Sequence, residues 1–391
     1  MSGVRSLIPR WITRALFSFV LLSGTAFAQP APTPLAPPIP PPPTLSSVQS
    51  YVLMDVTSGQ ILAAKHPNAR FAPASLAKLM TAYLTYQAVA GGTLTLNQQV
   101  PVTTTAWRTG GSRMFIQPGV PVDIEQLLGG LMVDSGNDAA VALAQAVAGS
   151  RSAFIGLMNS TAQRLGLTNT HYTNVDGLPA PDLYTSALDV ARLSDALLNR
   201  FPQILKISDQ RSFTYNKITQ PTWNPVLSRD PTVDGLKTGL TDEAGYCIDA
   251  TALRQGRQLI AVVMHGPSWS ASTAAIEALL DYGSRFFSEH AVYQQGQTAG
   301  TLTSTALVPL HTPVGPAEAV TIAVPKGHYR DLRVHLVLHT PTGTIRRGQI
   351  IGTIQFTIHG QLIKSVPAVA LKTARHANLV EEYWNRLRLA V

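Results

Sequence analysis

The strongest constraint on the fold is a change in sequence character near residue 288. Before this point, segments with helical apolar spacing alternate with short strand-like runs. After it, the chain consists of alternating runs rich in valine and threonine, separated by turn residues, at 319–324, 332–339, 350–358 and 362–371. The sequence therefore predicts an α+β fold, in which a helix-covered antiparallel sheet is followed by a small all-β domain.

The segment before residue 288 carries distinct helix and strand signals. Residues 51–63 predict a β-hairpin around Gly59, and residues 75–90 predict a central helix that ends at Gly91-Gly92. Further helices are expected at 124–131, 139–148, 152–165, 186–198 and 272–287, and further strands at 245–253 and 258–264. We expect the first and last strands of this sheet to meet beside the functional site.

The N-terminus reads as a secretory signal over residues 1–28. Three arginines precede an apolar stretch at 15–22, and Ala26-Phe27-Ala28 supplies small residues at a cleavage site. A retained membrane anchor is the alternative, but this stretch is well short of the about 20 residues that a spanning helix needs. Residues 29–46 are dominated by proline and predict an extended linker. We therefore expect an exported protein with an α+β domain at 47–288.

The C-terminal segment, 374–391, predicts an amphipathic helix after a β domain at 289–373. One face carries apolar residues and the other carries charged and polar ones, with Glu381, Glu382, Asn385, Arg386 and Arg388 opposite Leu379, Tyr383, Trp384, Leu387 and Val391. Aromatic residues beside basic ones are typical of helices that lie on a membrane surface. The two glutamates weaken that interpretation, and packing against the β domain is the alternative.

Charge and cysteine content exclude several classes of protein. The formal net charge is +8, but no run of Lys or Arg occurs, so the chain does not have the basic patch of a nucleic-acid-binding protein. The single cysteine, Cys247, excludes an internal disulfide and any site built from several cysteines. We expect it to be a packed thiol.

Three short patterns occur once each and in a fixed order. They are Ser75-Leu76-Ala77-Lys78, Ser135-Gly136-Asn137 and Lys237-Thr238-Gly239. A Ser-x-x-Lys or Ser-x-Asn pattern arises by chance in a chain of this length, whereas Lys-Thr-Gly does so far less often. The ordered trio is therefore the informative signal, and it indicates a serine nucleophile with a lysine base.

The surroundings of Ser75 suit nucleophilic catalysis. It lies at a predicted helix start, where backbone N–H groups and the helix dipole favour a developing oxyanion. Lys78 returns to the same helix face and can act as the base only if burial or a neighbouring cation, such as Lys237, lowers its pKa from about 10.4. Lys237 and Thr238 can also attract a substrate carboxylate, and the backbone after Gly239 offers a strand edge to a peptide.

Ser135 and Asn137 allow two interpretations. Alone, either residue would be read as the N-cap of the helix that follows. Beside the other two patterns, Ser135 is better explained as a hydroxyl that relays a proton to the leaving amine, and Asn137 as an amide that positions the substrate carbonyl and Lys78.

The remaining ionisable residues indicate neither a metal site nor a cofactor. His335 and His339 lie in a predicted strand, about 13 Å apart on one face, which is too far to share a metal. No metalloprotease helix, phosphate-binding loop or Gly-x-Ser-x-Gly motif occurs. Asp176 and Asp182 lie in a Gly/Pro-rich segment and read as turn formers. We expect no metal and no cofactor.

These motifs and their neighbours resemble the serine D-alanyl-D-alanine carboxypeptidases, the low-molecular-mass penicillin-binding proteins of the 5/6 type. The similarity runs from Tyr51 nearly to the C-terminus and includes Met114-Phe115, Asp138-Ala139 and Val233-Asp234-Gly235 beside the three motifs. It implies removal of the terminal D-Ala from peptidoglycan stem peptides, sensitivity to β-lactams, and attachment to the outer face of the cytoplasmic membrane through the C-terminal helix.

The resemblance also implies a role for each site residue. Ser75 would form the acyl-enzyme, Lys78 would be the general base, and Ser135 with Asn137 would complete the proton relay. The substrate-binding residues would be Lys237, Thr238, Gly239, Leu240 and Ser112. Two departures stand out: Leu240 replaces a histidine of the relatives, and residues 266–280 lack the arginine that helps to hold the substrate carboxylate.

Two other functions fit parts of this pattern. A class A β-lactamase shares the three motifs but needs a glutamate for deacylation, and no Glu occurs between Ser135 and Lys237. A catalytically weak protein that binds penicillin or peptidoglycan without turnover would fit the two departures at the carboxylate pocket.

Overall fold

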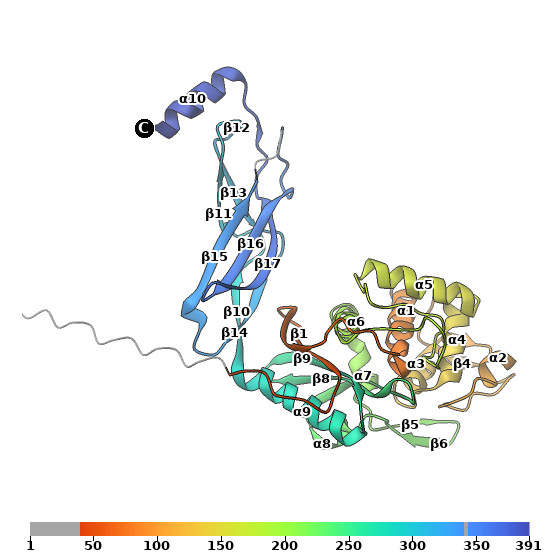
Figure 1. Cartoon of the computed structure of the whole chain (residues 1–391). Coiled ribbons are helices and arrows are strands. Elements are labelled where there is room, and N and C mark those ends of the chain that lie inside the picture. The colour runs from red at the N-terminus through yellow and green to blue at the C-terminus, as the bar shows by residue number, and fades with distance from the viewer. Residues whose placement is uncertain (1–39, 340–342, 391) are drawn as a thin grey trace, which may run out of the picture. The chain divides into compact units, whose positions relative to one another are not determined.

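The computed structural model describes residues 40–339 and 343–390. Its first part is built on a five-stranded antiparallel sheet in the order β2-β1-β9-β8-β7 (Figure 1). The strands are β1 (Ser50–Asp55), β2 (Gln60–Lys65), β7 (Val233–Thr241), β8 (Gly245–Arg254) and β9 (Arg257–Gly266). β1 pairs with β9, so the first and last strands of the sheet meet as expected, and the predicted 51–63 hairpin is confirmed. They do not meet beside the Lys237-Thr238-Gly239 motif, because this motif lies in β7 and β8 separates β7 from β9.

Alternation along β1 divides the core between the two faces of this sheet. Val52 and Met54 belong to the cluster that contains the helices on one face, whereas Tyr51 and Leu53 pack with the helix on the other. The first face is covered by α6 (Ala187–Arg200) with α1 (Lys78–Ala90) beside it, and the second by α9 (Trp269–Phe286). Every residue of α1 from Lys78 to Tyr86 is buried, so the predicted central helix is confirmed.

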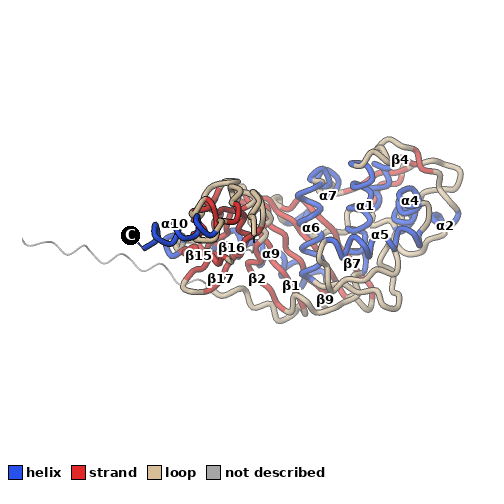
Figure 2. The backbone as a smooth tube through the Cα atoms, turned by 90° about the horizontal axis from the view of Figure 1, so that it is seen from above, coloured by secondary structure: helices blue, strands red, loops and turns tan. Residues whose placement is uncertain are grey.

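The other predicted helices form within about three residues of their expected limits. They are α3 (Ile124–Met132), α4 (Asn137–Ala148) and α5 (Arg151–Arg164), and Figure 2 shows α4 and α5 beside α1. α9 begins earlier than predicted because the Ser268 side chain accepts a hydrogen bond from the Ala271 N–H and caps it. Smaller elements complete this part: η1 (Ala74–Ala77), α2 (Thr104–Trp107), α7 (Leu205–Ser208), α8 (Val226–Arg229), and the strand pairs β3 (Gln99–Val100) with β4 (Val122–Asp123) and β5 (Ser212–Tyr215) with β6 (Ile218–Pro221).

The part after α9 contains mainly strands, as predicted. β10 (Phe287–Tyr293) pairs with β14 (Val320–Pro325), and a five-stranded sheet has the order β11-β13-β17-β16-β15. Its strands are β11 (Gly300–Thr303), β13 (His311–Pro316), β15 (Leu332–Leu338), β16 (Ile350–Ile358) and β17 (Gln361–Ala370), and the short strands β12 (Leu307–Val308) and β18 (Arg375–His376) pair beside it. A separate apolar cluster that includes Ile322, Ile354 and Phe356 fills this part.

The final helix, α10 (Leu379–Ala390), contacts the β domain through Asn385, a residue of its predicted polar face. Asn385 is buried, and its amide donates hydrogen bonds to the carbonyls of Thr305 and Leu307, each at 3.0 Å. An amide at this position satisfies buried backbone carbonyls that an apolar side chain would leave unpaired. Val391, the signal segment 1–28 and linker residues 29–39 lie outside the described residues.

Among the described residues, no single helix is long and apolar enough to cross a membrane. The helices α4 and α5 reach that limit only as a pair, and they are bent by 84° relative to each other. The domain limits expected above stay predictions.

Candidate active site

The three sequence motifs converge on one cleft of about 410 Å³. Ser75 comes from the 3-10 turn η1, Ser135 from the connection between α3 and α4, and Thr238 from β7. The cleft is lined by Ser75, Gly111, Ser112, Ser135, Trp223, Thr238, Gly239, Leu240 and Trp269. Ser112 and Leu240, two of the expected substrate-binding residues, therefore line the same cleft as Ser75.

Lys78 lies directly below Ser75. Its Nζ is 2.7 Å from Ser75 Oγ and donates a hydrogen bond to the Asp176 carbonyl at 2.8 Å. The predicted 75–90 helix is in fact split here, because Ser75 lies in η1 and the α-helix begins at Lys78. Burial lowers the pKa of Lys78 to about 7, although the carboxylates of Asp176 and Asp138 act in the opposite direction. A neutral amine at hydrogen-bonding distance can accept the proton of the hydroxyl.

Lys237 connects the second and third motifs. Its Nζ donates hydrogen bonds at 3.0 Å to Ser135 Oγ and to the Thr238 carbonyl, and its side chain is almost fully buried. Burial, followed by the nearby Lys78, lowers the pKa of Lys237 well below its usual value. Of the two causes that the sequence offered for a lowered pKa of Lys78, burial or a neighbouring cation such as Lys237, burial is the one that lowers it.

Asn137 secures the loop that forms one wall of the cleft. Its backbone N–H donates to the Ser112 carbonyl at 2.8 Å and its side-chain amide donates to the Gly110 carbonyl at 2.6 Å. Ser112 Oγ donates in turn to the Ser135 carbonyl at 2.7 Å. The N-cap of α4 is Gly136, without a side-chain cap, so neither Ser135 nor Asn137 acts as the alternative N-cap.

Asp138, the residue after the second motif, holds the next stretch of the same loop. Its carboxylate accepts hydrogen bonds from the backbone N–H groups of Met114, Phe115 and Ile116. No sequence signal indicated a role for Asp138 beyond the resemblance, because its partners lie more than twenty positions earlier in the chain. Together Asn137 and Asp138 fix residues 110–116 around the cleft.

The turn that carries Ser75 is fixed by close backbone contacts. Ala74 has a φ of +45°, and a Cβ atom at Gly177 would lie 1.7 Å from the Ala74 carbonyl oxygen. Gly239 in β7 is also close to this turn, though less tightly, since a Cβ there would lie 3.0 Å from the Ser75 backbone nitrogen. Asp176 is a turn former, as predicted, but its backbone carbonyl also holds Lys78. Sequence reasoning missed this second role.

Two tryptophans that the sequence did not single out also line the cleft. Trp223 precedes α8, and Trp269 opens α9 in the segment that lacks the arginine expected of the family. No sequence signal distinguishes either residue from a packed aromatic side chain. Leu240, beside them, is 43% exposed at the rim. This end of the cleft is consequently more apolar than the resemblance implied.

Comparison with known families identifies this arrangement. Residues 39–268 match the D-alanyl-D-alanine carboxypeptidase family, and residues 287–375 match the C-terminal domain of penicillin-binding protein 5. The chain belongs to the D-alanyl-D-alanine carboxypeptidase family. It is a serine-type peptidase of the penicillin-binding protein 5/6 type, so the predicted family, fold class and enzyme class are confirmed.

The similarity to individual carboxypeptidases extends over both domains. The chain is 36% identical over 346 residues to the D-alanyl-D-alanine carboxypeptidase DacC of Escherichia coli, covering 86% of each chain. The structure matches penicillin-binding protein 5 of Haemophilus influenzae with a TM-score of 0.79 at 32% identity, over 86% of this chain and 99% of that one. Penicillin-binding protein 6B of Escherichia coli gives a TM-score of 0.69 at 34% identity, over 85% and 98%. None of these comparisons favours the β-lactamase or the non-catalytic alternative.

Proposed function

We propose that this carboxypeptidase removes the terminal D-Ala from peptidoglycan stem peptides through an acyl-enzyme on Ser75. The observation that carries the proposal is the 2.7 Å distance between Ser75 Oγ and a buried Lys78 whose pKa is about 7. A serine hydroxyl becomes a nucleophile when a neutral base of matched pKa lies at this distance.

In the first half-reaction Lys78 accepts the hydroxyl proton while Ser75 Oγ attacks the carbonyl of the penultimate D-Ala. The backbone N–H groups of Ser75 and Leu240 stabilise the oxyanion of the tetrahedral intermediate. Ser135, which Lys237 contacts, relays the proton to the leaving amine, so the peptide bond breaks and free D-Ala departs. In the second half-reaction a water molecule, deprotonated by the same base, attacks the ester and regenerates Ser75.

Lys237 and Thr238 bind the terminal carboxylate of the substrate. An approaching carboxylate favours the charged form of Lys237, which opposes the effect of burial on its pKa. Asn137 and Ser112 hold the opposite wall, and the outer edge of β7 after Gly239 pairs with the peptide backbone. β-Lactams would acylate Ser75 through the same contacts; penicillin-binding protein D2 of Listeria monocytogenes has been solved in an ampicillin-bound form.

The test is to follow D-alanine release from a diacetyl-Lys-D-Ala-D-Ala peptide together with labelling by a fluorescent penicillin. Ser75→Ala should abolish both, whereas Ser228→Ala, at an exposed site in α8, should abolish neither. Labelling without release would support the non-catalytic binder. Labelling that persists in Ser75→Ala would show that another residue is the nucleophile.

We also propose that the protein acts outside the cytoplasmic membrane and attaches to its outer face through α10. The support is an apolar surface on that helix opposite Asn385, where Leu379, Val380, Tyr383 and Trp384 are each more than half exposed. Asn385 docks the helix on the β domain, so the packing and membrane interpretations are compatible. Apolar and aromatic residues on a docked helix can enter the headgroup region of a bilayer.

Sedimentation with anionic phospholipid vesicles tests the attachment. Trp384→Glu should move the protein to the supernatant, whereas Leu253→Glu, which places the same charge on an exposed apolar site of β8, should not. Equal sedimentation of both variants would overturn the attachment without affecting the proposed peptidase activity.

A further inference from the structure

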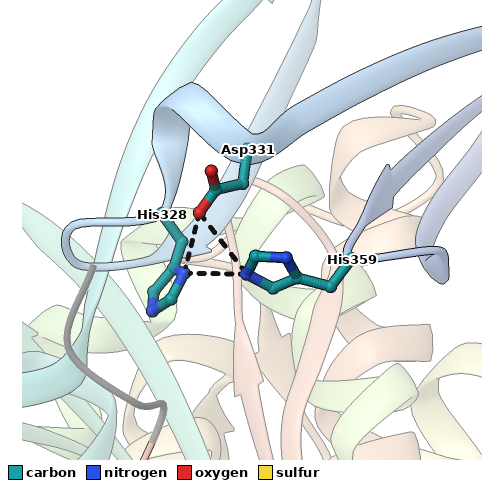
Figure 3. A group of neighbouring side chains, drawn as sticks. All are labelled: His328, Asp331 and His359. Atoms are coloured by element: carbon teal, nitrogen blue, oxygen red, sulfur yellow. Dashed lines mark hydrogen bonds and ion pairs between the residues drawn. The ribbon is translucent and has the colours of Figure 1, made fainter. Parts of the chain in front are cut away.

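We propose that His328, Asp331 and His359 bind a divalent transition-metal ion of the Zn²⁺ type in the C-terminal β domain. Figure 3 shows the three side chains pointing toward a common centre. His328 Nδ1 lies 3.0 Å and His359 Nε2 lies 3.4 Å from the same oxygen, Asp331 Oδ2. The two ring nitrogens are 3.3 Å apart.

Two of these separations, 3.3 and 3.4 Å, match the edges of a zinc coordination tetrahedron, and the third, 3.0 Å, is a few tenths of an ångström shorter. Zn–N bonds of about 2.0–2.1 Å and Zn–O bonds of about 2.0–2.2 Å place neighbouring ligand atoms about 3.3–3.5 Å apart. The nitrogens and the carboxylate oxygen therefore already lie at three corners of the polyhedron. An ion could enter with shifts of only a few tenths of an ångström.

The donor set also has the right chemistry. Imidazole nitrogens and a carboxylate oxygen are common ligands of Zn²⁺ and related first-row ions. Each of the two ring nitrogens offers a lone pair in the tautomer that carries its proton on the other ring nitrogen, and Asp331 Oδ2 offers one as well. One cation at the centre interacts with all three lone pairs at once.

Strand register explains why residues from two connections meet here. Leu332 of β15 pairs with Ile358 of β16, so Asp331, just before the first, lies opposite His359, just after the second. His359 and Gly360 form the two-residue turn between β16 and β17, with φ values of +48° and +77°. Such turns favour Asn-Gly, so a histidine at the first position is not explained by turn geometry alone.

His328 completes the group from the connection between β14 and β15. It is the residue before the 3-10 turn η3 (Tyr329–Asp331), and its ring is perpendicular to that of His359, with 5.4 Å between centroids. The side chain of His328 is 6% exposed, that of Asp331 is 32% and that of His359 is 60%. The buried ligand anchors the site while the exposed ones leave an approach for the ion and for a water ligand.

The proposed ion would cross-link the β14–β15 connection to the β16–β17 turn, and so stabilise the domain whenever the metal is present. It has no part in the proposed peptidase chemistry. The sequence predicted no metal because the only histidine pair it considered was His335 and His339, and the actual ligands lie on separate turns.

The test uses the tag-free mature chain, stripped with a chelator and titrated with Zn²⁺ by calorimetry and with Co²⁺ by absorption spectroscopy. We expect one equivalent to bind and the thermal midpoint to rise. His359→Asn removes one ligand yet keeps a residue that the turn favours, so this variant should fold and lose more than about 100-fold in affinity, since loss of even an orienting group costs about 10–100-fold. His335→Asn, exposed on β15, is the matched control and should bind as the parent does.

Two results would overturn the metal site. One is the absence of saturable binding by the parent chain, and the other is equal binding by the His359→Asn and His335→Asn variants. D-alanine release should be the same in all three proteins, so failure of the metal site and failure of the proposed function are distinguishable.

Discussion

Lys78 Nζ lies 2.7 Å from Ser75 Oγ at the bottom of the cleft, although the lysine side chain is fully buried. Burial sets the pKa of Lys78 at about 7, so the amine is protonated below that pH and neutral above it. Because only the neutral amine can accept the proton of Ser75, acylation should accelerate about tenfold per pH unit up to about pH 7 and then level off. The rate constant of labelling by a fluorescent penicillin, measured from pH 5 to pH 9, checks this profile.

A lysine-to-arginine exchange controls for the identity of the base. Arginine keeps its proton across this range, so Lys78→Arg should label at a negligible rate at every pH. A flat profile for the parent enzyme, or a Lys78→Arg variant that labels normally, would contradict the assignment of Lys78 as the base.

Gly177 should be essential for the position of Ser75. A Cβ atom at this residue would lie 1.7 Å from the Ala74 carbonyl oxygen, and this oxygen belongs to backbone next to Ser75 that cannot yield without moving the nucleophile. We expect Gly177→Ala to lower kcat/KM for D-alanine release by about 100-fold or more, since a displacement near 1 Å costs that much.

Gly166 supplies the matched control for backbone strain. Gly166 and Gly177 have φ values of +68° and +86°, but a Cβ at Gly166 would meet nothing within 4 Å. Gly166→Ala should therefore show the stability cost of a positive φ without the loss of activity. If both variants lose activity equally, strain rather than the contact with Ala74 is responsible.

Asp249 should make stability depend on pH. This carboxyl group is buried in β8, where Ser194 Oγ donates to it at 2.6 Å, and burial raises its pKa to about 7 from 3.8. The folded state therefore holds a proton that the unfolded state releases near pH 4. Its stabilising effect is complete below that pH and is lost as the pH rises through about 7.

Asp249→Asn removes this titration. From pH 5 to pH 8, the free energy of unfolding of the parent should fall by about 2–3 kcal/mol more than that of the variant. Urea titrations of both proteins at the two pH values measure this difference. Asp209→Asn, at an exposed position, controls for the removal of one carboxylate charge. A difference between parent and Asp249→Asn that stays constant with pH would contradict the raised pKa.

The sequence predicted the elements whose signals are periodic and local. The apolar spacing of α1 and α6 and the alternation in β16 gave limits within about three residues, because burial of one face requires that spacing. The β5–β6 hairpin was missed because its turn residues, Asn216 and Lys217, both have positive φ without the Asn-Gly pair that marks such turns.

The sequence predicted the site residues whose side-chain chemistry the reaction requires. It did not predict the contacts that other segments of the fold make with them. The order of the motifs identifies Ser75, Lys78 and Lys237. The group that holds Lys78 is the backbone carbonyl of Asp176, and every residue type has such a carbonyl, so the sequence does not mark it. The same holds for the walls formed by Trp223 and Trp269, which the fold assembles from distant loops. Buried Asn385 and the His328 group likewise depend on contacts between segments that no local pattern encodes.

Among charged residues outside the cleft, we expect substitution of Arg257 to lower the free energy of unfolding the most. Its guanidinium pairs with buried Asp55 and donates to the carbonyls of Gly283 and Phe287 at 3.1 and 2.9 Å. Arg257→Met would leave the carboxylate of Asp55 buried without its cation, at a cost of about 3–5 kcal/mol in unfolding free energy.

The double variant Asp55→Asn/Arg257→Met distinguishes a stranded charge from lost packing. If the cost of Arg257→Met arises from the unpaired carboxylate, neutralising Asp55 should restore part of the stability. Arg229→Met, which breaks an exposed pair with Glu277, should change stability little, because solvent screens that pair. A double variant less stable than Arg257→Met alone would instead show that the hydrogen bonds that the Asp55 carboxylate accepts from Ser58 matter more than its charge.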